Sequence, residues 1–196
     1  MNFKAILVVA TVSLGFLGCK NTEQKKETTT PQIEEIQVVE KEDVLDERYL
    51  IQGNSFMGIR PLDPIELHSN LLQRGKIKVD EVVKEVLVLE IDGEEVGYAT
   101  PNREDKRMVG SSTFQSPKII TDKGIKVGAT FGEVLKKYAN LELRTTKNGK
   151  KIYAKSESIA FLLDLDAKGK AVTIEAIPEA TKVIEIKLVN NKISNN

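Results

Sequence analysis

Short runs of β-branched and aliphatic residues, separated by turn residues, dominate the hydrophobic pattern after residue 48. The most regular run is 86–91 (VLVLEI), which is followed by Asp92-Gly93 and another extended stretch. Asp-Gly favours the positive φ angles of a two-residue turn, so this stretch predicts a β-hairpin. Asn148-Gly149 predicts a second hairpin for the same reason. The other predicted extended segments are 49–51, 119–120, 125–128, 141–146, 151–155, 159–165 and 182–189.

One principal helix is predicted at 130–139. Thr130 and Glu133 have the spacing of a capping box, in which each side chain accepts a hydrogen bond from the other residue's backbone. Apolar residues then recur with a helical period and form one stripe, which we expect to face a sheet. Asn140 is a candidate left-handed stop. The stripe comprises Phe131, Val134, Leu135 and Tyr138, and we expect Lys136 and Lys137 in solvent.

The closing segment KVIEIKLV has the alternation of a half-buried strand. We expect Ile184, Ile186 and Leu188 to face the core and Glu185 and Lys187 to face solvent. Hairpins, one helix and a closing strand together predict an α+β fold. It would consist of an antiparallel sheet of about six strands with the principal helix packed on it.

The structure of two further segments is predicted from a weaker hydrophobic pattern. The stretch 65–73 (IELHSNLLQ) predicts a short helix that Asp63 and Pro64 would begin. It contains His68, the single histidine, which we interpret as a surface or core residue rather than a ligand because no motif partner accompanies it. The polar stretch 101–112 is predicted to be an irregular exposed loop.

The N-terminus has the layout of a bacterial lipoprotein signal. Lys4 precedes an apolar run at 5–17, and Gly18 precedes Cys19, the only cysteine. The run is shorter than the roughly 20 residues that a membrane-spanning helix needs. We predict a signal peptide at 1–18 and acylation, with palmitate among the acyl chains, at Cys19. An ordinary secreted protein cut elsewhere and an uncleaved anchor are the alternatives.

The predicted domain organisation follows from the composition after Cys19. Residues 19–47 are polar and charged over most of their length and predict a flexible tether. The part at 33–44 has scattered Ile and Val among acids and is left unassigned. Residues 48–196 are predicted to form a single α+β domain.

Charge and ring composition narrow the function classes. The chain has 29 basic and 29 acidic residues, so no electrostatic attraction to nucleic acid is expected. It contains one histidine and no tryptophan, which argues against a histidine-built metal site or a carbohydrate-stacking site.

One segment, 164–175 (DLDAKGKAVTIE), has the acidic and glycine spacing of a calcium-binding EF-hand loop. Lys168 and Val172 occupy positions that should offer oxygen ligands, and the flanks resemble strands. We therefore interpret 167–170 as a polar β-turn and expect no metal. The sequence has no Gly-x-Ser-x-Gly elbow, no free cysteine once Cys19 is acylated, and no pair of carboxylates that stands out from the surface charge, so no catalytic residue is assigned. No cofactor is assigned either.

From Ser116 onward, the order of strand, GIKVG, Thr130-Phe131, helix, hairpin and closing KVIEIKLV resembles a known family. This is a family of small bacterial envelope lipoproteins of unknown function that is regulated by the envelope-stress factor sigma-E. The resemblance implies an α+β fold and an envelope location, and it supplies no activity or site residues. Family members carry further cysteines that this chain lacks, so no disulfide is implied.

We therefore expect a non-enzymatic binding or structural lipoprotein of the bacterial cell envelope. It would attach through its lipidated N-terminus to the outer rather than the inner membrane and contact an envelope protein partner. A carrier of a small or lipidic ligand is the first alternative and needs a concave apolar pocket. An envelope hydrolase is the second alternative and needs a nucleophile or a metal cluster.

Overall fold

The computed structural model describes residues 45–79, 81–146, 149–167, 169 and 171–190. The predicted signal peptide, Cys19 and nearly all of the predicted tether lie outside the described residues. What the sequence predicts for those segments therefore stays a prediction. No helix in the described part of the chain is long and apolar enough to cross a membrane.

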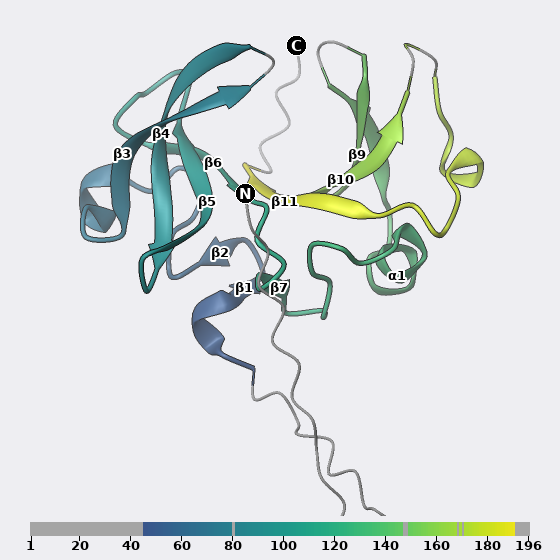
Figure 1. Ribbon diagram of the computed structural model, residues 1–196, viewed down its shortest axis with the longest axis horizontal. Coiled ribbons are helices and arrows are strands. Elements are labelled where there is room, and N and C mark those ends of the chain that lie inside the picture. The colour runs from purple at the N-terminus through teal and green to yellow at the C-terminus, as the bar shows by residue number, and fades with distance from the viewer. Residues whose placement is uncertain (1–44, 80, 147–148, 168, 170, 191–196) are drawn as a thin grey trace, which may run out of the picture. The chain divides into compact units, whose positions relative to one another are not determined.

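An antiparallel sheet of eight strands, in the order β3-β4-β5-β6-β11-β10-β9-β8, forms most of the structure (Figure 1). Many of its strands are rich in Val, Ile and Leu, which suit a pleated and half-buried surface. The strands are β3 (Leu72–Val79), β4 (Val82–Ile91), β5 (Glu94–Pro101), β6 (Val109–Phe114), β8 (Glu142–Thr145), β9 (Lys151–Ser156), β10 (Ile159–Asp166) and β11 (Val183–Val189).

A smaller sheet of three strands has the order β2-β1-β7. It consists of β1 (Leu50–Gln52), β2 (Ser55–Phe56) and β7 (Ile120–Thr121), and β1 runs parallel to β7. The α-helix α1 (Phe131–Lys137) and three short 3-10 helices complete the described elements. These 3-10 helices are η1 (Glu47–Tyr49), η2 (Ile65–His68) and η3 (Ile174–Ala176).

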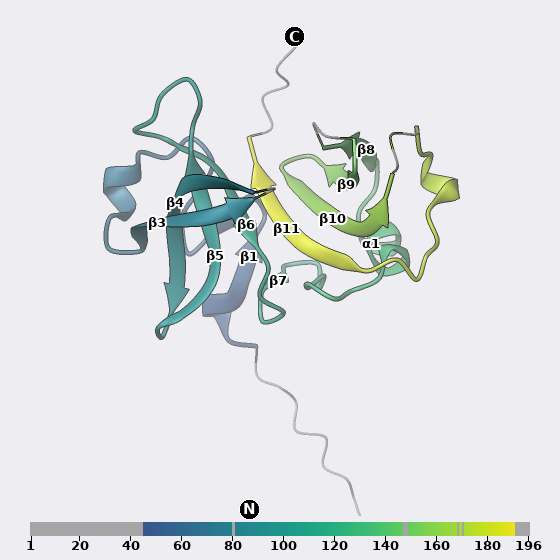
Figure 2. The same cartoon turned by 45° about the horizontal axis from the view of Figure 1, so that its top comes forward.

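The core lies on one face of the large sheet. Phe114, Phe161 and Ile186 are fully buried there, and the strand register places Ile186 directly opposite both phenylalanines. Phe56 of the small sheet contacts Phe114 with 4.6 Å between ring centroids, and Tyr138 after α1 contacts Phe161 at 4.9 Å. Figures 1 and 2 show β3, β4 and β5 on one side, β8, β9 and β10 with α1 on the other, and β11 between them.

The N-terminal cap of α1 is confirmed. The backbone N–H of Thr130 donates to Glu133 Oε2 at 2.6 Å, and the Glu133 N–H donates to Thr130 Oγ1 at 3.3 Å. The pKa of Glu133 is lowered because its carboxylate accepts hydrogen bonds from the backbone N–H and from the hydroxyl of Thr130. Asn140 has a φ of +54°, as a left-handed stop requires.

The predicted burial of Leu135 is wrong. Phe131 and Val134 are completely buried and Tyr138 is 6% exposed, but Leu135 is 37% exposed. Successive helical residues point about 100° apart, so Leu135 lies beside the buried stripe rather than within it. The short helix therefore covers the sheet with a narrower face than the sequence pattern indicates.

The prediction of one principal helix on an antiparallel sheet is confirmed, but the structure is mostly β and its large sheet has eight strands rather than about six. The strand β3 is not predicted from the sequence, because its charged residues Arg74, Lys76 and Lys78 break the apolar alternation. The exposed loop predicted at 101–112 is wrong at its end, because residues 109–112 belong to β6 and Val109 is completely buried.

The predicted helix at 65–73 is mostly wrong. Only Ile65–His68 is helical, as a 3-10 turn, and β3 begins at Leu72. Pro64 is the N-cap and has no side-chain capping bond. Asp63 instead accepts a hydrogen bond from the backbone N–H of Arg60 at 2.9 Å.

The predicted exposure of Glu185 is wrong, since this residue is only 7% exposed. It lies on the face opposite the core, as the alternation predicts, but its carboxylate is covered there and accepts hydrogen bonds from Tyr153 and Gln115.

The predicted core position of Ile184 is wrong for a different reason. The pairing of β11 with β10 shifts register, so that Glu185 lies opposite Leu162 but Val183 lies opposite Leu163. This irregularity turns Val183 rather than Ile184 into the core: Val183 is completely buried and Ile184 is partly exposed. A sequence pattern of strict period two cannot reveal such a bulge.

Candidate functional site

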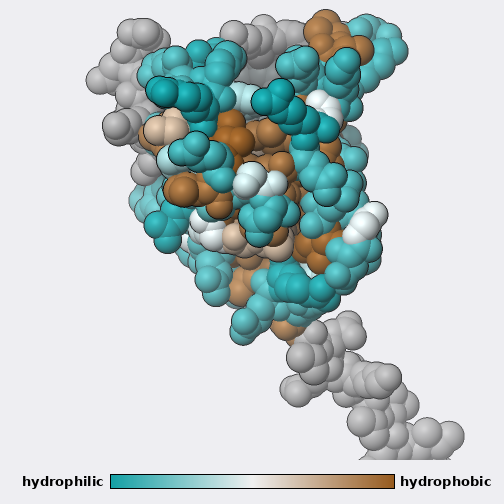
Figure 3. All heavy atoms as spheres, turned by 90° about the vertical axis from the view of Figure 1, so that its left-hand side faces the viewer, coloured by the Kyte–Doolittle hydropathy of each residue, from teal (hydrophilic) through white to brown (hydrophobic). Residues whose placement is uncertain are grey.

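A groove lies between η2, the β3–β4 hairpin and the loop that follows β5. We call it the β3–β4 groove; its volume is about 1470 Å³. Figure 3 shows this side of the molecule, where hydrophobic residues gather in the middle and hydrophilic residues surround them. The apolar residues that line the groove include Ile65, Leu72, Leu87 and Met108.

Backbone pairing joins two walls of the groove, the segment at η2 and the loop that follows β5. The N–H of Ile65 donates to the carbonyl of Arg107 at 2.8 Å, and Pro64 forms an isolated β-bridge with Met108. The loop between them turns at Asn102, whose side-chain oxygen accepts from the N–H of Glu104 at 2.8 Å. The groove is therefore built into the fold.

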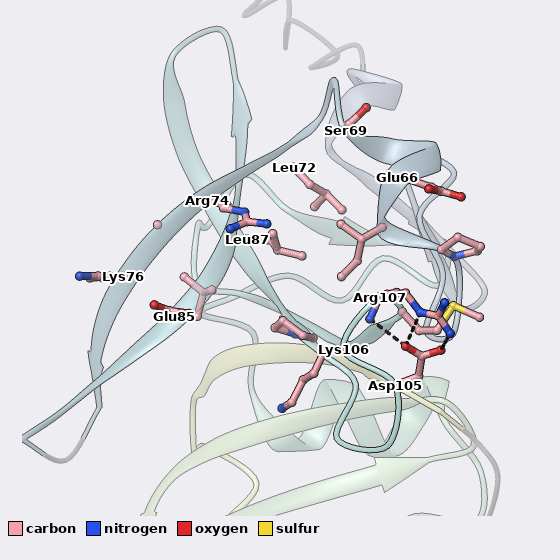
Figure 4. Close-up of a pocket in the computed structure, with 16 residues that line it drawn as sticks. Glu66, Ser69, Leu72, Arg74, Lys76, Glu85, Leu87, Asp105, Lys106 and Arg107 are labelled. Atoms are coloured by element: carbon pink, nitrogen blue, oxygen red, sulfur yellow. Dashed lines mark hydrogen bonds and ion pairs between the residues drawn. The ribbon is translucent and has the colours of Figure 1, made fainter.

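The strand register determines which side chains of the hairpin face the groove. Arg74 lies opposite Leu87, and Lys76 lies opposite Glu85. Because cross-strand partners point to the same face, these four side chains share the face that lines the groove. In Figure 4 the guanidinium of Arg74 lies close to Leu87.

Among the charged residues on the rim of the groove, two form an ion pair with each other and several form none. Arg107 donates from Nη2 to Asp105 Oδ2 at 2.9 Å and from Nε to Oδ1 at 3.0 Å, as Figure 4 shows. These hydrogen bonds lower the pKa of Asp105 to about 2 and raise that of Arg107. Within the described residues, Arg74, Lys76 and Lys106 form no ion pair, and the rim carboxylates Glu66 and Glu85 form none either. Three cations of the rim are therefore available to a ligand.

Beside the groove, His68 has an acidic partner that the sequence analysis did not identify. Its Nε2 lies 3.1 Å from Asp63 Oδ2, and both side chains are partly buried. Asp63 precedes His68 by five residues, a spacing that matches no motif. The pair lies at the base of η2 and fixes the turn that forms one wall of the groove.

The opposite face of the large sheet carries a buried polar cluster. The hydroxyl of Tyr153 donates to Glu185 Oε1 at 2.8 Å, and Gln115 Nε2 donates to Glu185 Oε2 at 3.2 Å. Lys187 lies near Tyr153, with Nζ 5.9 Å from the ring centroid. Burial raises the pKa of Tyr153 and lowers that of Lys187. The hydrogen bonds satisfy the buried Glu185 carboxylate, which indicates a structural role.

The residues singled out from the sequence are not brought together into a site. Cys19 lies outside the described residues. Asp164 and Asp166 lie in β10 and Glu175 in η3, and the helices that flank an EF-hand loop do not occur there. In the described part of the chain, no three His, Cys, Asp or Glu side chains are placed to hold a metal ion. The groove itself could not be predicted from the sequence, because its walls come from three separate segments, 64–76, 85–87 and 101–108.

Comparisons with known proteins add little. No protein-family profile and no curated protein matches the chain. Among solved structures, the chain is similar to the crystal structure of the uncharacterized protein YfeY from Escherichia coli. The TM-score is 0.42 with 16% sequence identity, over 66% of this chain and 90% of that chain. This structural similarity is weak, and we draw no conclusion about function from it.

Proposed function

We propose that the protein is a lipid-anchored envelope protein that acts by binding a partner in the β3–β4 groove, without catalysis. The observation that carries this proposal is an apolar floor bordered by cations that have no ion-pair partner in the described residues. Apolar lining with a few convergent polar groups is typical of binding sites. Charged rims of this kind favour correct orientation and faster encounter.

The anchor in this proposal is Cys19. Acyl chains there would attach the chain to the envelope membrane, in our proposal the outer membrane. A tether at 19–47 would reach on the order of 30 Å from the anchor if it behaves as a flexible coil. A binding domain at that distance could meet an envelope protein while remaining membrane-attached.

A carrier of a small or lipidic ligand is the second candidate, and the apolar floor of the groove favours it. At about 1470 Å³ the groove exceeds the roughly 300–1000 Å³ of ordinary small-molecule sites. Its apolar floor, including Leu72 and Leu87, would suit a hydrocarbon chain. A groove of this size accommodates either an extended segment of a protein or a large amphiphile.

The test compares two tryptophan substitutions at neighbouring exposed residues. Ser69 lines the groove, whereas Asn70 does not. Ser69→Trp should fill the groove with little effect on the fold, and Asn70→Trp is the matched control. Full-length protein is extracted in detergent from its own envelope and analysed by native mass spectrometry.

We expect a bound mass with the wild type and with Asn70→Trp, and its loss with Ser69→Trp. The bound mass distinguishes the candidates, because a polypeptide indicates a protein partner and a small amphiphile indicates a carrier. Equal binding by all three proteins, or no bound mass with any of them, would overturn the proposed function.

A further inference from the structure

The strand β3 forms a free edge of the large sheet beside the groove. It is the first strand in the sheet order, and its only neighbour is β4. Within the described residues, no backbone hydrogen bond outside the β4 ladder involves Leu72–Val79. An unpaired edge presents a row of N–H and C=O groups that can pair with another extended chain.

The hairpin turn determines which of these groups face outward. Val79 and Val82 are register partners only three positions apart in the sequence, so they form a hydrogen-bonded pair. Such pairs alternate along an antiparallel ladder with pairs that are not hydrogen-bonded. The N–H and C=O groups of Leu72, Arg74 and Lys76 therefore point away from β4, toward the free edge.

The side chains next to this edge carry positive charge. Arg74, Lys76 and Lys78 alternate along β3 and share the face that lines the groove, and all three are exposed. Lys78 is paired with Glu81, and Lys76 has Glu85 across the strand on β4. Arg74 has only Leu87 opposite it, so an added strand would find an uncompensated cation at its centre.

We propose that the partner is an extended acidic segment of another envelope protein, which pairs with β3 as an additional strand. This inference rests on the proposed function and names the chemistry of the partner. Main-chain hydrogen bonds to the free edge would supply affinity, as in other strand-addition complexes. Acidic side chains opposite Arg74 and Lys76 would select the sequence, and apolar side chains would enter the groove beside Leu72.

A bound amphiphile, the ligand of the alternative carrier function, would account for fewer of these observations. It would use the apolar floor and Arg74, but it would leave the main-chain groups of β3 without partners. Gly75 also lines the groove, but its own N–H and C=O face Val86 on β4, so the residues on either side of it offer the free main-chain groups. A side chain at this position would meet Val88 Cγ2 at 2.4 Å, so the close fit of β3 against β4 requires glycine.

Two substitutions at one residue separate main-chain pairing from charge. Lys76→Ala removes the charge and keeps the N–H that faces the free edge. Lys76→Pro removes both and leaves the β4 ladder intact, because proline is tolerated where the N–H faces outward. Arg74→Glu reverses the central charge, and Lys137→Glu on α1 is the matched charge-reversal control.

The probe is a short, capped, fluorescein-labelled peptide with Glu, Glu and Leu at successive alternate positions and Thr between them, so that one face carries two acids and one apolar side chain. It is titrated with the full-length protein in detergent and followed by anisotropy. We expect binding of this peptide, and none of the same peptide with Lys in place of Glu. Lys76→Pro should weaken binding about threefold to tenfold more than Lys76→Ala, which corresponds to one main-chain hydrogen bond. Arg74→Glu should weaken binding further, and Lys137→Glu should leave it unchanged.

Methylation of alternate peptide nitrogens should also abolish binding, and this control does not depend on the folding of any variant. Equal binding by Lys76→Ala and Lys76→Pro together with full binding of the methylated peptide would overturn the inference. If Ser69→Trp removed the natural bound mass while the acidic peptide failed to bind, the groove would remain the binding site and only this assignment of its partner would fail. A natural bound mass that proved to be an amphiphile would likewise overturn it.

Discussion

Removal of the Tyr153 hydroxyl should destabilise the protein measurably. In the folded protein this hydroxyl donates at 2.8 Å to Glu185, a carboxylate that is only 7% exposed. Tyr153→Phe would leave Gln115 as the remaining side-chain donor to that carboxylate, at 3.2 Å. A hydrogen bond to a charged group contributes about 1.5–3 kcal/mol, and we expect a loss of stability in that range.

The assay is urea unfolding at neutral pH, on a soluble form that begins at Lys20. Tyr49→Phe is the matched control, because the Tyr49 hydroxyl forms no hydrogen bond within the described residues. We expect Tyr49→Phe to change the free energy of unfolding by less than about 0.5 kcal/mol. Equal losses in the two variants would refute the assignment of a stabilising role to the Tyr153–Glu185 hydrogen bond.

For the same variant, Tyr153→Phe, we also predict a change in how the free energy of unfolding depends on alkaline pH. Burial, and to a smaller extent the charge of Glu185, raises the pKa of Tyr153 above its usual range. Below pH 10 the phenol is protonated in both states, so its contribution is fully present. Above pH 10 the unfolded state loses this proton first, and stability falls by about 1.4 kcal/mol per pH unit for such a group. Tyr153→Phe should therefore lose stability less steeply above pH 10 than the wild type, and an equal slope would contradict the raised pKa.

Three further predictions concern the anchor, the tether and the helix. The wild type should incorporate labelled fatty acid and partition with membranes, and Cys19→Ser should do neither; equal labelling would contradict lipidation. Limited proteolysis should cleave within 20–47 and leave a stable fragment that begins between residues 39 and 48, whereas a first cut inside the large sheet would contradict the predicted organisation. In urea unfolding, Val134→Ala should cost about 2–3 kcal/mol, because it leaves a cavity at a completely buried position. Leu135→Ala should cost about 1 kcal/mol, since this residue is 37% exposed, and the reverse order would show that the helix faces the other way.

Local signals predicted the parts of the fold that depend on neighbouring residues. The Asp92-Gly93 turn has φ angles of +52° and +79°, and the capping box of α1 forms as its spacing predicts. Both features are determined within four residues of sequence. The strands rich in Val and Ile were recognised for the same reason.

Long-range effects account for what the sequence did not predict. The edge strand β3 carries alternating cations that conceal its period, and the register shift in β11 turns Val183 rather than Ile184 into the core. The groove depends on the meeting of η2, the β3–β4 hairpin and the loop after β5, which no local pattern encodes. A binding site built from separate segments becomes visible only when the chain is folded.

The central claim is that the β3–β4 groove is where the protein meets its partner in the envelope. Its most direct test is photo-crosslinking in living cells, with a photoreactive residue in place of Lys106 on the groove rim or of Lys137 on α1. We predict a discrete adduct from position 106, its loss when Ser69→Trp is added, and none from position 137. No adduct from position 106, or the same adduct from both positions, would contradict the account.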